Sequence, residues 1–220
     1  DHFCGKFFMS DSLPILSTIE ARVLGTLVEK QRTVPDTYPL SLNTLVAGCN
    51  QKTSRNPVLE VEEADVLQAL NRLKALELVS SVSGGRVARY AHHLEKVLGI
   101  PTQASALVTV LLLRGAQTAG ELRLNCERLH KFADISSVEA FLEELATRPE
   151  GGLVVELPRL PGSRENRWTH LLSGTPDIEV TTARMPAVAR GNSNEIDALT
   201  RRVEALEAEV ASLRARLGDV

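Results

Sequence analysis

The sequence contains few aromatic residues and no long apolar run. Only 4% of its 220 residues are aromatic whereas 43% are hydrophobic, so any core consists mainly of Leu, Val and Ala. No run approaches the roughly 18 apolar residues of a membrane span, so we expect no membrane association. Residues 1–14 begin without the apolar core of a signal peptide. We predict that this segment is disordered or lies upstream of a natural start at Met9.

Cysteine is scarce and irregularly placed. The three cysteines, Cys4, Cys49 and Cys126, are odd in number and share no metal-ligand spacing. This fits free thiols in a reducing cytoplasm better than a disulfide framework. Cys126 and His130 are four residues apart on a predicted helix, but two ligands do not make a zinc site. We therefore expect a cytoplasmic protein without metal or cofactor, in which this pair packs half-buried.

The sequence also lacks catalytic motifs and an excess of basic residues. It has no Gly-rich phosphate loop and no nucleophile elbow. The pair Glu143-Glu144 is better explained as a solvated face than as an acid/base pair. We therefore expect a protein that is not an enzyme and has no catalytic residues. The net charge is −3, and no segment has the basic excess of a strong general nucleic-acid binder.

One pattern occurs twice along the chain: three amphipathic helical stretches are followed by two β-like runs around a turn. In the first copy, a capping box that spans Ser17 and Glu20 starts the first helix. Gly84 and Gly85 provide the positive φ angles of a tight hairpin. The helices are predicted at about 17–31, 41–48 and 62–78, and the strands at 79–82 and 87–91.

The second copy begins after Pro101 with an apolar helical stripe. Capping boxes at Thr118 and Ser136 start its second and third helices. Its strands are predicted at 153–157 and 167–172. The repeated order predicts a mainly α fold with small β-hairpins, of the α+β class, built as two tandem winged-helix domains at 15–93 and 94–173.

The end of the chain combines a linker and a heptad run. Residues 174–194 are rich in Thr, Pro, Gly, Asn and Ser, which indicates a linker. Residues 195–220 are predicted to form a coiled-coil helix. Its core positions are all aliphatic: Ile196, Leu199, Val203, Leu206, Val210, Leu213 and Leu217. β-Branched residues at a and Leu at d favour a two-stranded parallel coil and hence a homodimer. The flanking charges also suit an antiparallel pair, and a helix folded back on its own domains is the alternative to dimerisation.

Several longer motifs carry a family resemblance. They are YPLSLNTLVAGCNQKTSRNPV, GGRVARY, LLLRGAQTAGELR, RLHKF and LPRLPGSRENRWTHLL. Together they resemble the YceH family, a group of bacterial proteins of unknown function, over about residues 16–172. The resemblance implies a tandem winged-helix fold in a bacterial cytoplasm. It implies no catalytic or binding residues.

In a winged helix the third helix enters the major groove of DNA. The third helix of the first copy carries Gln68, Asn71 and Arg72 opposite its apolar stripe, and such side chains are able to read base edges. We predict phosphate contacts from the preceding loop and the wing, through Lys52, Arg55, Arg86 and Arg89. Three carboxylates at the start of this helix, from Glu62, Glu63 and Asp65, oppose that role.

In the second copy, Glu143 and Glu144 lie in the middle of the corresponding helix and argue against insertion into a groove. Its wing carries Arg159, Arg164 and Arg167, which suit phosphate or an acidic protein surface. Two hypotheses follow. The first is a DNA-binding, transcription-regulator-like dimer with double-stranded DNA as its partner. The second is a protein-interaction module that uses the winged-helix scaffold without DNA and binds an unidentified protein.

Overall fold

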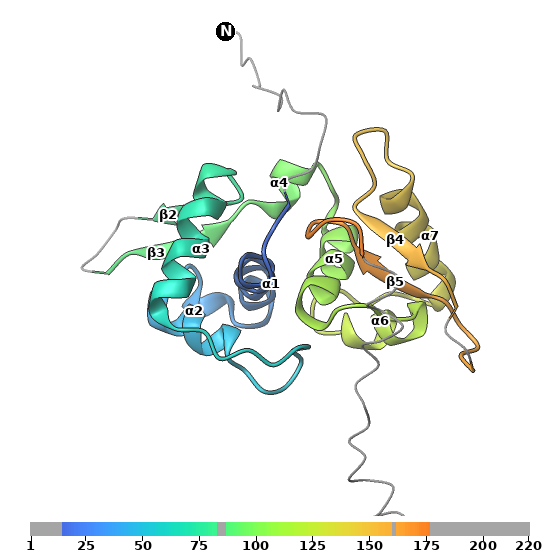
Figure 1. Cartoon of the computed structure of the whole chain (residues 1–220), viewed down its shortest axis with the longest axis horizontal. Helices are drawn as coiled ribbons and strands as arrows, with labels where there is room; N and C mark the ends of the chain where they lie inside the picture. The colour runs from blue at the N-terminus through green and yellow to red at the C-terminus, as the bar shows by residue number, and fades with distance from the viewer. Residues whose placement is uncertain (1–14, 83–86, 160–161, 177–220) are drawn as a thin grey trace, which may run out of the picture. The chain divides into compact units, whose positions relative to one another are not determined.

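The computed structural model describes residues 15–82, 87–159 and 162–176, and in these ranges the chain is mainly helical with two small antiparallel sheets (Figure 1). The α+β class predicted from the sequence is confirmed. From residue 177 onward, the predicted linker and heptad run lie outside the described residues, as does Arg86 of the predicted first wing.

The first repeat contains three helices and a three-stranded sheet. Its elements are α1 (Thr18–Thr33), a 3-10 turn (Pro35–Thr37), β1 (Leu40–Ser41), α2 (Leu42–Cys49), α3 (Glu63–Ala75), β2 (Val79–Val82) and β3 (Arg89–His92). The capping box at the start of α1 is confirmed: Ser17 Oγ accepts the Glu20 N–H at 3.2 Å, and Glu20 Oε2 accepts the Ser17 N–H at 2.8 Å. The sheet order is β1-β3-β2, and the two-residue strand β1 is too short for a sequence pattern to predict.

A short helix that the sequence pattern did not indicate, α4 (Leu94–Leu98), precedes the second repeat. The elements of this repeat are α5 (Thr102–Arg114), α6 (Ala119–Asn125), α7 (Ile135–Ala146), β4 (Val154–Leu157) and β5 (Arg167–His170). The capping box at Thr118 is confirmed. The one predicted at Ser136 is wrong, because Asp134 is the N-cap of α7 and accepts the Ser137 N–H at 2.7 Å and the Ser137 hydroxyl at 2.6 Å.

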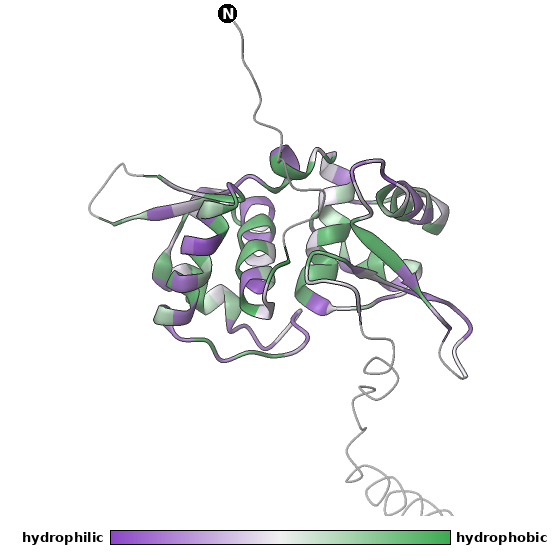
Figure 2. Cartoon of the chain, turned by 45° about the horizontal axis from the view of Figure 1, so that its top comes forward, coloured by the Kyte–Doolittle hydropathy of each residue, from purple (hydrophilic) through white to green (hydrophobic). Residues whose placement is uncertain are grey.

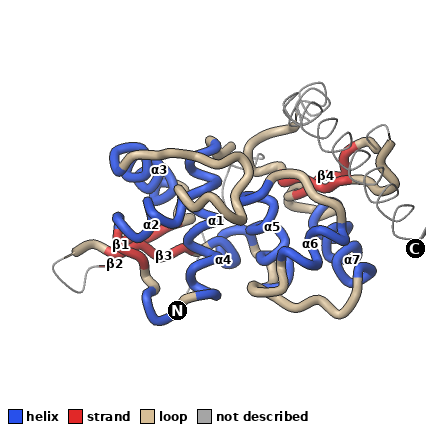
Figure 3. The backbone as a smooth tube through the Cα atoms, turned by 90° about the horizontal axis from the view of Figure 1, so that it is seen from below, coloured by secondary structure: helices blue, strands red, loops and turns tan. Residues whose placement is uncertain are grey.

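Helices α1 and α5 lie side by side between the outer elements of the two repeats. Figures 1 and 3 show α3 and the β2–β3 hairpin on one side of this pair, and α7 and the β4–β5 hairpin on the other. Residues 20–28 of α1 and 104–113 of α5 are buried without interruption. A helix that buries every side lies inside a core, whereas a surface helix buries one stripe.

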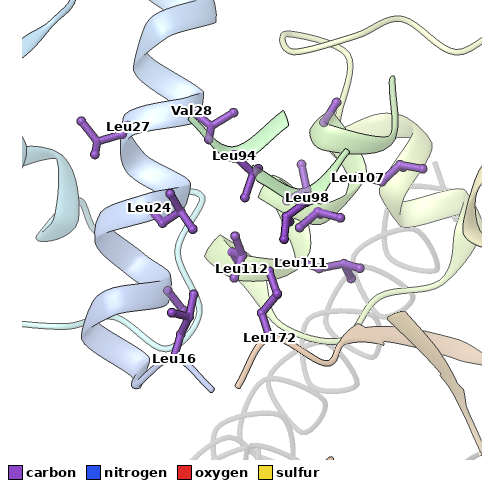
Figure 4. Packing of buried hydrophobic residues seen from close by; sticks show 14 of the residues in the cluster. Leu16, Leu24, Leu27, Val28, Leu94, Leu98, Leu107, Leu111, Leu112 and Leu172 are labelled. Carbon is purple, nitrogen blue, oxygen red and sulfur yellow. The ribbon is translucent and has the colours of Figure 1, made fainter. Parts of the chain in front are cut away.

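The apolar cluster therefore runs continuously through both repeats. Figure 4 shows Leu16 and Leu24 of the first repeat across from Leu112 and Leu172 of the second. Hydropathy colouring shows hydrophobic residues along α5 and β4 and hydrophilic residues on the outer helix α3 (Figure 2). The described residues up to Pro176 belong to one compact unit.

Polar contacts also connect the two repeats. The Arg32 guanidinium at the end of α1 forms an ion pair with Glu95 of α4 at 2.5 Å and donates to the Thr102 carbonyl at 3.1 Å. The Leu16 N–H donates to the Leu172 carbonyl at 2.7 Å, and the Asn56 N–H donates to the Leu113 carbonyl at 2.9 Å. These bonds join residues of the two repeats beside the apolar contact.

Candidate functional site

The outward face of α3 carries the polar residues that the helical spacing predicts. Val66, Ala69, Leu70 and Leu73 point into the core. Gln68, Asn71 and Arg72 are exposed on the opposite side. Helical periodicity thus separates the two faces as expected. What the sequence does not indicate is the neighbour of this face, which is the start of α1.

A groove of about 550 Å³ lies between α3 and the start of α1. Its apolar side chains come from both elements: Leu16 and Ala69 are buried, Ile19 is half-buried, and Ile15 is 64% exposed. The polar side chains of the groove are those of Ser17, Glu20, Asp65, Gln68 and Arg72. Two of the three residues predicted to read bases therefore line a concave surface.

The charged groups of the groove are bonded to one another and to the helix starts. Glu20 Oε1 forms an ion pair with Arg72 Nε at 3.2 Å, while the other carboxylate oxygen accepts the Ser17 N–H. Asp65 Oδ2 accepts the Glu62 N–H at 3.0 Å in the capping box of α3. The Glu20 side chain is only 8% exposed, but that of Arg72 is 60% exposed. The Glu20 carboxylate of this ion pair is therefore fixed by burial and by its bond to Ser17, whereas the Arg72 side chain extends into solvent.

Arg55 is not a surface residue, and its prediction as a phosphate contact is wrong. The residue is 6% exposed, and its guanidinium forms a two-point contact with the Glu29 carboxylate at 2.6 and 3.1 Å. It also donates to the Gly48 carbonyl at 3.0 Å. Burial raises the pKa of Glu29, but the hydrogen bonds and charge of Arg55 outweigh this effect and lower that pKa. Arg55 therefore fixes the loop between α2 and α3.

A second buried arginine in this region was not anticipated. Arg22 of α1 is 2% exposed and donates to the Cys49 carbonyl at 3.1 Å and the Pro57 carbonyl at 2.6 Å. Burial, together with the charge of Arg55, lowers the pKa of the Arg22 guanidinium. Its bonds attach the end of α2 and the middle of the same loop to α1. Local sequence gives no signal for such a residue, because both partners are backbone carbonyls far along the chain.

The remaining predicted contacts of the first repeat are dispersed. Arg89 is exposed, and its Nη1 donates to the Pro39 carbonyl at 2.8 Å and the Thr37 carbonyl at 3.3 Å, which ties β3 to the turn before β1. Lys52 is exposed on the loop after α2. The structure therefore brings Gln68 and Arg72 together in the groove but does not add Arg55 to them.

The basic residues of the second hairpin have unequal surroundings. Arg167 forms an ion pair with Glu121 of α6 at 2.9 Å and donates to the Ala116 carbonyl at 2.8 Å. Arg159 and Arg164 are exposed, and in the described parts of the chain neither forms an ion pair. Glu143 and Glu144 of α7 are exposed, as the solvated-face interpretation expects.

Two cysteine and three histidine side chains of the described ranges are placed as packing groups. Burial raises the pKa of Cys49 to about 11 and that of Cys126 to about 12, so both remain thiols at neutral pH. The His130 ring packs edge-on against Phe132. His92 and His93 have different partners, Gln31 and Ser80 respectively. Within the described ranges, no three His, Cys, Asp or Glu side chains gather where they could hold a metal ion.

These observations define a class: an α+β protein of two joined repeats, each with three helices and a hairpin, with a groove beside α3. The chain belongs to the DUF480 family of proteins of unknown function, whose sequence profile matches residues 16–163. The resemblance to bacterial proteins without an assigned role is confirmed, while the narrower YceH name stays a prediction.

Similar proteins span nearly the whole chain. A UPF0502 protein of Dechloromonas aromatica is 69% identical over 210 residues, which cover 95% of this chain and 97% of that protein. A UPF0502 protein of Burkholderia thailandensis is 57% identical, over 94% of this chain and 88% of its own length. One from Methylibium petroleiphilum is 58% identical, over 90% and 85%. No helix in the described ranges is long and apolar enough to cross a membrane.

Proposed function

We propose that this protein is a non-enzymatic protein-interaction module of the bacterial cytoplasm, built on tandem winged-helix domains at 15–93 and 94–173. Its partner-binding surface is the groove between α3 and the start of α1. The heptad run at 195–220 joins two copies into a homodimer. The buried free thiols Cys49 and Cys126 support the reducing compartment.

The concave setting of α3 carries this proposal. A recognition helix reads bases by projecting its exposed side chains into the major groove. Gln68 and Arg72 instead share a groove with the apolar side chains of Ile15 and Ile19. Apolar and polar side chains that converge in a concavity favour a protein segment or another ligand that fills it.

Ion pairs within the chain that engage its basic side chains support the same conclusion. DNA affinity comes largely from cations that neutralise phosphates. Arg55, Arg72 and Arg167 are each paired with a carboxylate of the same chain. The first turn of α3 is acidic as well, with Glu62 and Glu63 exposed. A DNA phosphate near this helix start would meet negative charge.

Phosphate contact through the hairpins is the second candidate function. Arg159 and Arg164 are exposed on the second hairpin, and Lys52 is exposed on the loop after α2. A wing is able to contact phosphate while no helix reads bases. Under this proposal the protein binds double-stranded DNA, with affinity that depends on Arg159 and Arg164 and little on Gln68, Asn71 or Arg72.

Fluorescence anisotropy of a mixed-sequence DNA duplex separates the two candidates. The interaction module predicts weak binding even at low salt and a shallow dependence of affinity on salt concentration. Tight binding that weakens steeply with salt would favour DNA. In that case Arg159→Glu with Arg164→Glu tests the hairpin, and Gln68→Ala with Asn71→Ala tests reading by α3.

Site-specific photo-crosslinking in the native host tests the groove directly. A photoreactive residue at position 68 should form a defined adduct with a protein, whereas one at exposed Glu139 of α7 should not. Ile15→Ser in the same chain should remove the adduct, because it deletes an apolar side chain of the groove at a residue that is 64% exposed. An adduct that is equally strong from both positions would contradict the proposal.

A further inference from the structure

We infer that the groove beside α3 binds a partner segment that presents a lysine or arginine between aliphatic side chains. This inference rests on the proposed function and specifies the chemistry of the partner. It is carried by two properties of the same surface: an apolar floor next to exposed aliphatic residues, and an excess of carboxylates over cations around it.

The apolar part of the groove lies at the start of α1. Ile15 is 64% exposed, and Ile19 is half-buried one helical turn further on. Leu16 and Ala69 form the buried floor beneath them. Covering such side chains removes apolar area from water, which favours aliphatic groups in the bound segment.

The charged part of the groove is predominantly acidic. Glu20 and Asp65 line it, and Glu62 and Glu63 precede Asp65 at the exposed start of α3. Arg72 is the cation among the lining residues, and it is already paired with Glu20. Complementarity of charge therefore selects a cationic partner group over an anionic one.

The shape of a lysine or arginine side chain suits both parts at once. Its methylene stem is able to lie along Ile15 and Ile19 while its charged head reaches Glu20 or Asp65. Each carboxylate oxygen accepts more than one hydrogen bond, so the bonds to Ser17 and Glu62 do not saturate these groups. A carboxylate of a partner would lie close to the same groups and would be repelled.

In the free chain, Arg72 occupies the place of the partner cation at Glu20. Its side chain is 60% exposed, and its Nε lies 3.2 Å from Glu20 Oε1. Because the Arg72 side chain is mostly exposed, an incoming guanidinium or ammonium is able to take its place beside Glu20. Arg72 thus competes with the cation of the bound segment for Glu20. Removal of the Arg72 side chain should therefore strengthen binding of that segment.

The probe is a phage-displayed library of random short peptides selected on the full-length protein. Enriched peptides should carry Lys or Arg flanked by Leu, Ile or Val. In the double variant Glu20→Gln with Asp65→Asn, their affinity should fall by about tenfold or more, because charge-assisted bonds are lost. Gln at position 20 retains the reach-back bond of the capping box, so the start of α1 is preserved.

Two further variants test whether the loss of affinity is specific to the groove and whether Arg72 competes with the peptide. Glu143→Gln with Glu144→Gln removes the same charge from α7 and should leave peptide affinity unchanged. Arg72→Ala should strengthen binding of basic peptides, because the competitor is removed. If Arg72→Ala abolishes binding, Arg72 contacts the peptide and the inference is wrong.

The outcomes also separate this inference from the function on which it rests. Peptides that are sensitive to Ile15→Ser but are acidic or uncharged would overturn the inference and leave the groove as a protein-binding surface. If no enriched peptide depends on Ile15, both the inference and the assignment of this groove are wrong.

Discussion

Gly25 of α1 lies directly against Leu113 of α5. A Cβ atom on Gly25 would lie 3.0 Å from both Cγ and Cδ2 of Leu113 and 3.3 Å from Cβ of Leu112. These distances are shorter than ordinary van der Waals contact. The absence of a side chain at Gly25 therefore allows the central helices of the two repeats to approach each other closely.

Gly25→Ala should destabilise the protein although alanine is the better helix former. The extra methyl group must displace the buried Leu113 or separate the helices, and overpacking of this kind costs about 1–3 kcal/mol. Urea denaturation measures the change in the free energy of unfolding. Gly120→Ala in α6 is the matched control, because its nearest neighbours are 3.8 Å away or further. That change should stabilise the chain by up to about 1 kcal/mol through helix propensity.

Loss of the Arg55 side chain should be costly for folding and not specifically for partner binding. Arg55→Ala leaves Glu29 and the Gly48 carbonyl without their buried donor, and breaking such a pair costs about 3 kcal/mol or more. Lys52→Ala, at an exposed position three residues earlier, should change stability by less than about 0.5 kcal/mol. Thermal or urea denaturation of both variants makes the comparison. Equal stabilities would contradict the structural role of Arg55.

Helix starts could be predicted from the sequence because a capping box is a local signal. The boxes at Ser17 and Thr118 are both present. The one at Ser136 is absent because Asp134, also a favoured N-cap residue, begins the helix two residues earlier. The number and order of the main helices likewise follow from periodicity, which depends on residues close together in the chain.

The roles of the arginines could not be predicted, because their partners are distant in sequence. Arg55 lies 26 residues after Glu29, and Arg72 pairs with a carboxylate at the start of α1. Nothing in the local pattern distinguishes these arginines from the exposed Arg159. The groove was missed for the same reason: it forms where α1 meets α3, and amphipathic periodicity describes each helix separately.

Acid should destabilise the protein through His92. Its Nδ1 accepts the Leu94 N–H at 3.3 Å, so in the neutral ring Nε2 carries the proton and donates to Gln31 at 2.6 Å. Burial, together with the charges of Arg32 and His93, lowers the pKa of His92 from 6.5 to about 4, although Glu95 opposes the shift. If Nδ1 became protonated, its N–H would face the Leu94 N–H. Two donors would then point at each other and the hydrogen bond would be lost.

The sign of the effect follows from proton binding. As the pH falls from 6.5 towards 4, the unfolded chain binds a proton at His92 before the folded chain does. The free energy of unfolding therefore decreases over this window, by about 3 kcal/mol at most for this residue. His92→Gln should be less stable at neutral pH but should lose less stability on acidification. Urea denaturation across the window measures both slopes, and parallel slopes would exclude His92 as the source.

The proposed dimer depends on the apolar seam of the heptad run. Truncation after Asn192 should convert the protein to a monomer in sedimentation analysis. In the full chain, Leu199→Lys with Leu206→Lys should do the same, because two d positions then place charge in the seam. Ala205→Lys with Ala208→Lys adds the same charge at positions outside the seam and should leave the dimer intact. If the truncated chain still sediments as a dimer, the contact lies within residues 1–192, and the role proposed for the heptads is wrong.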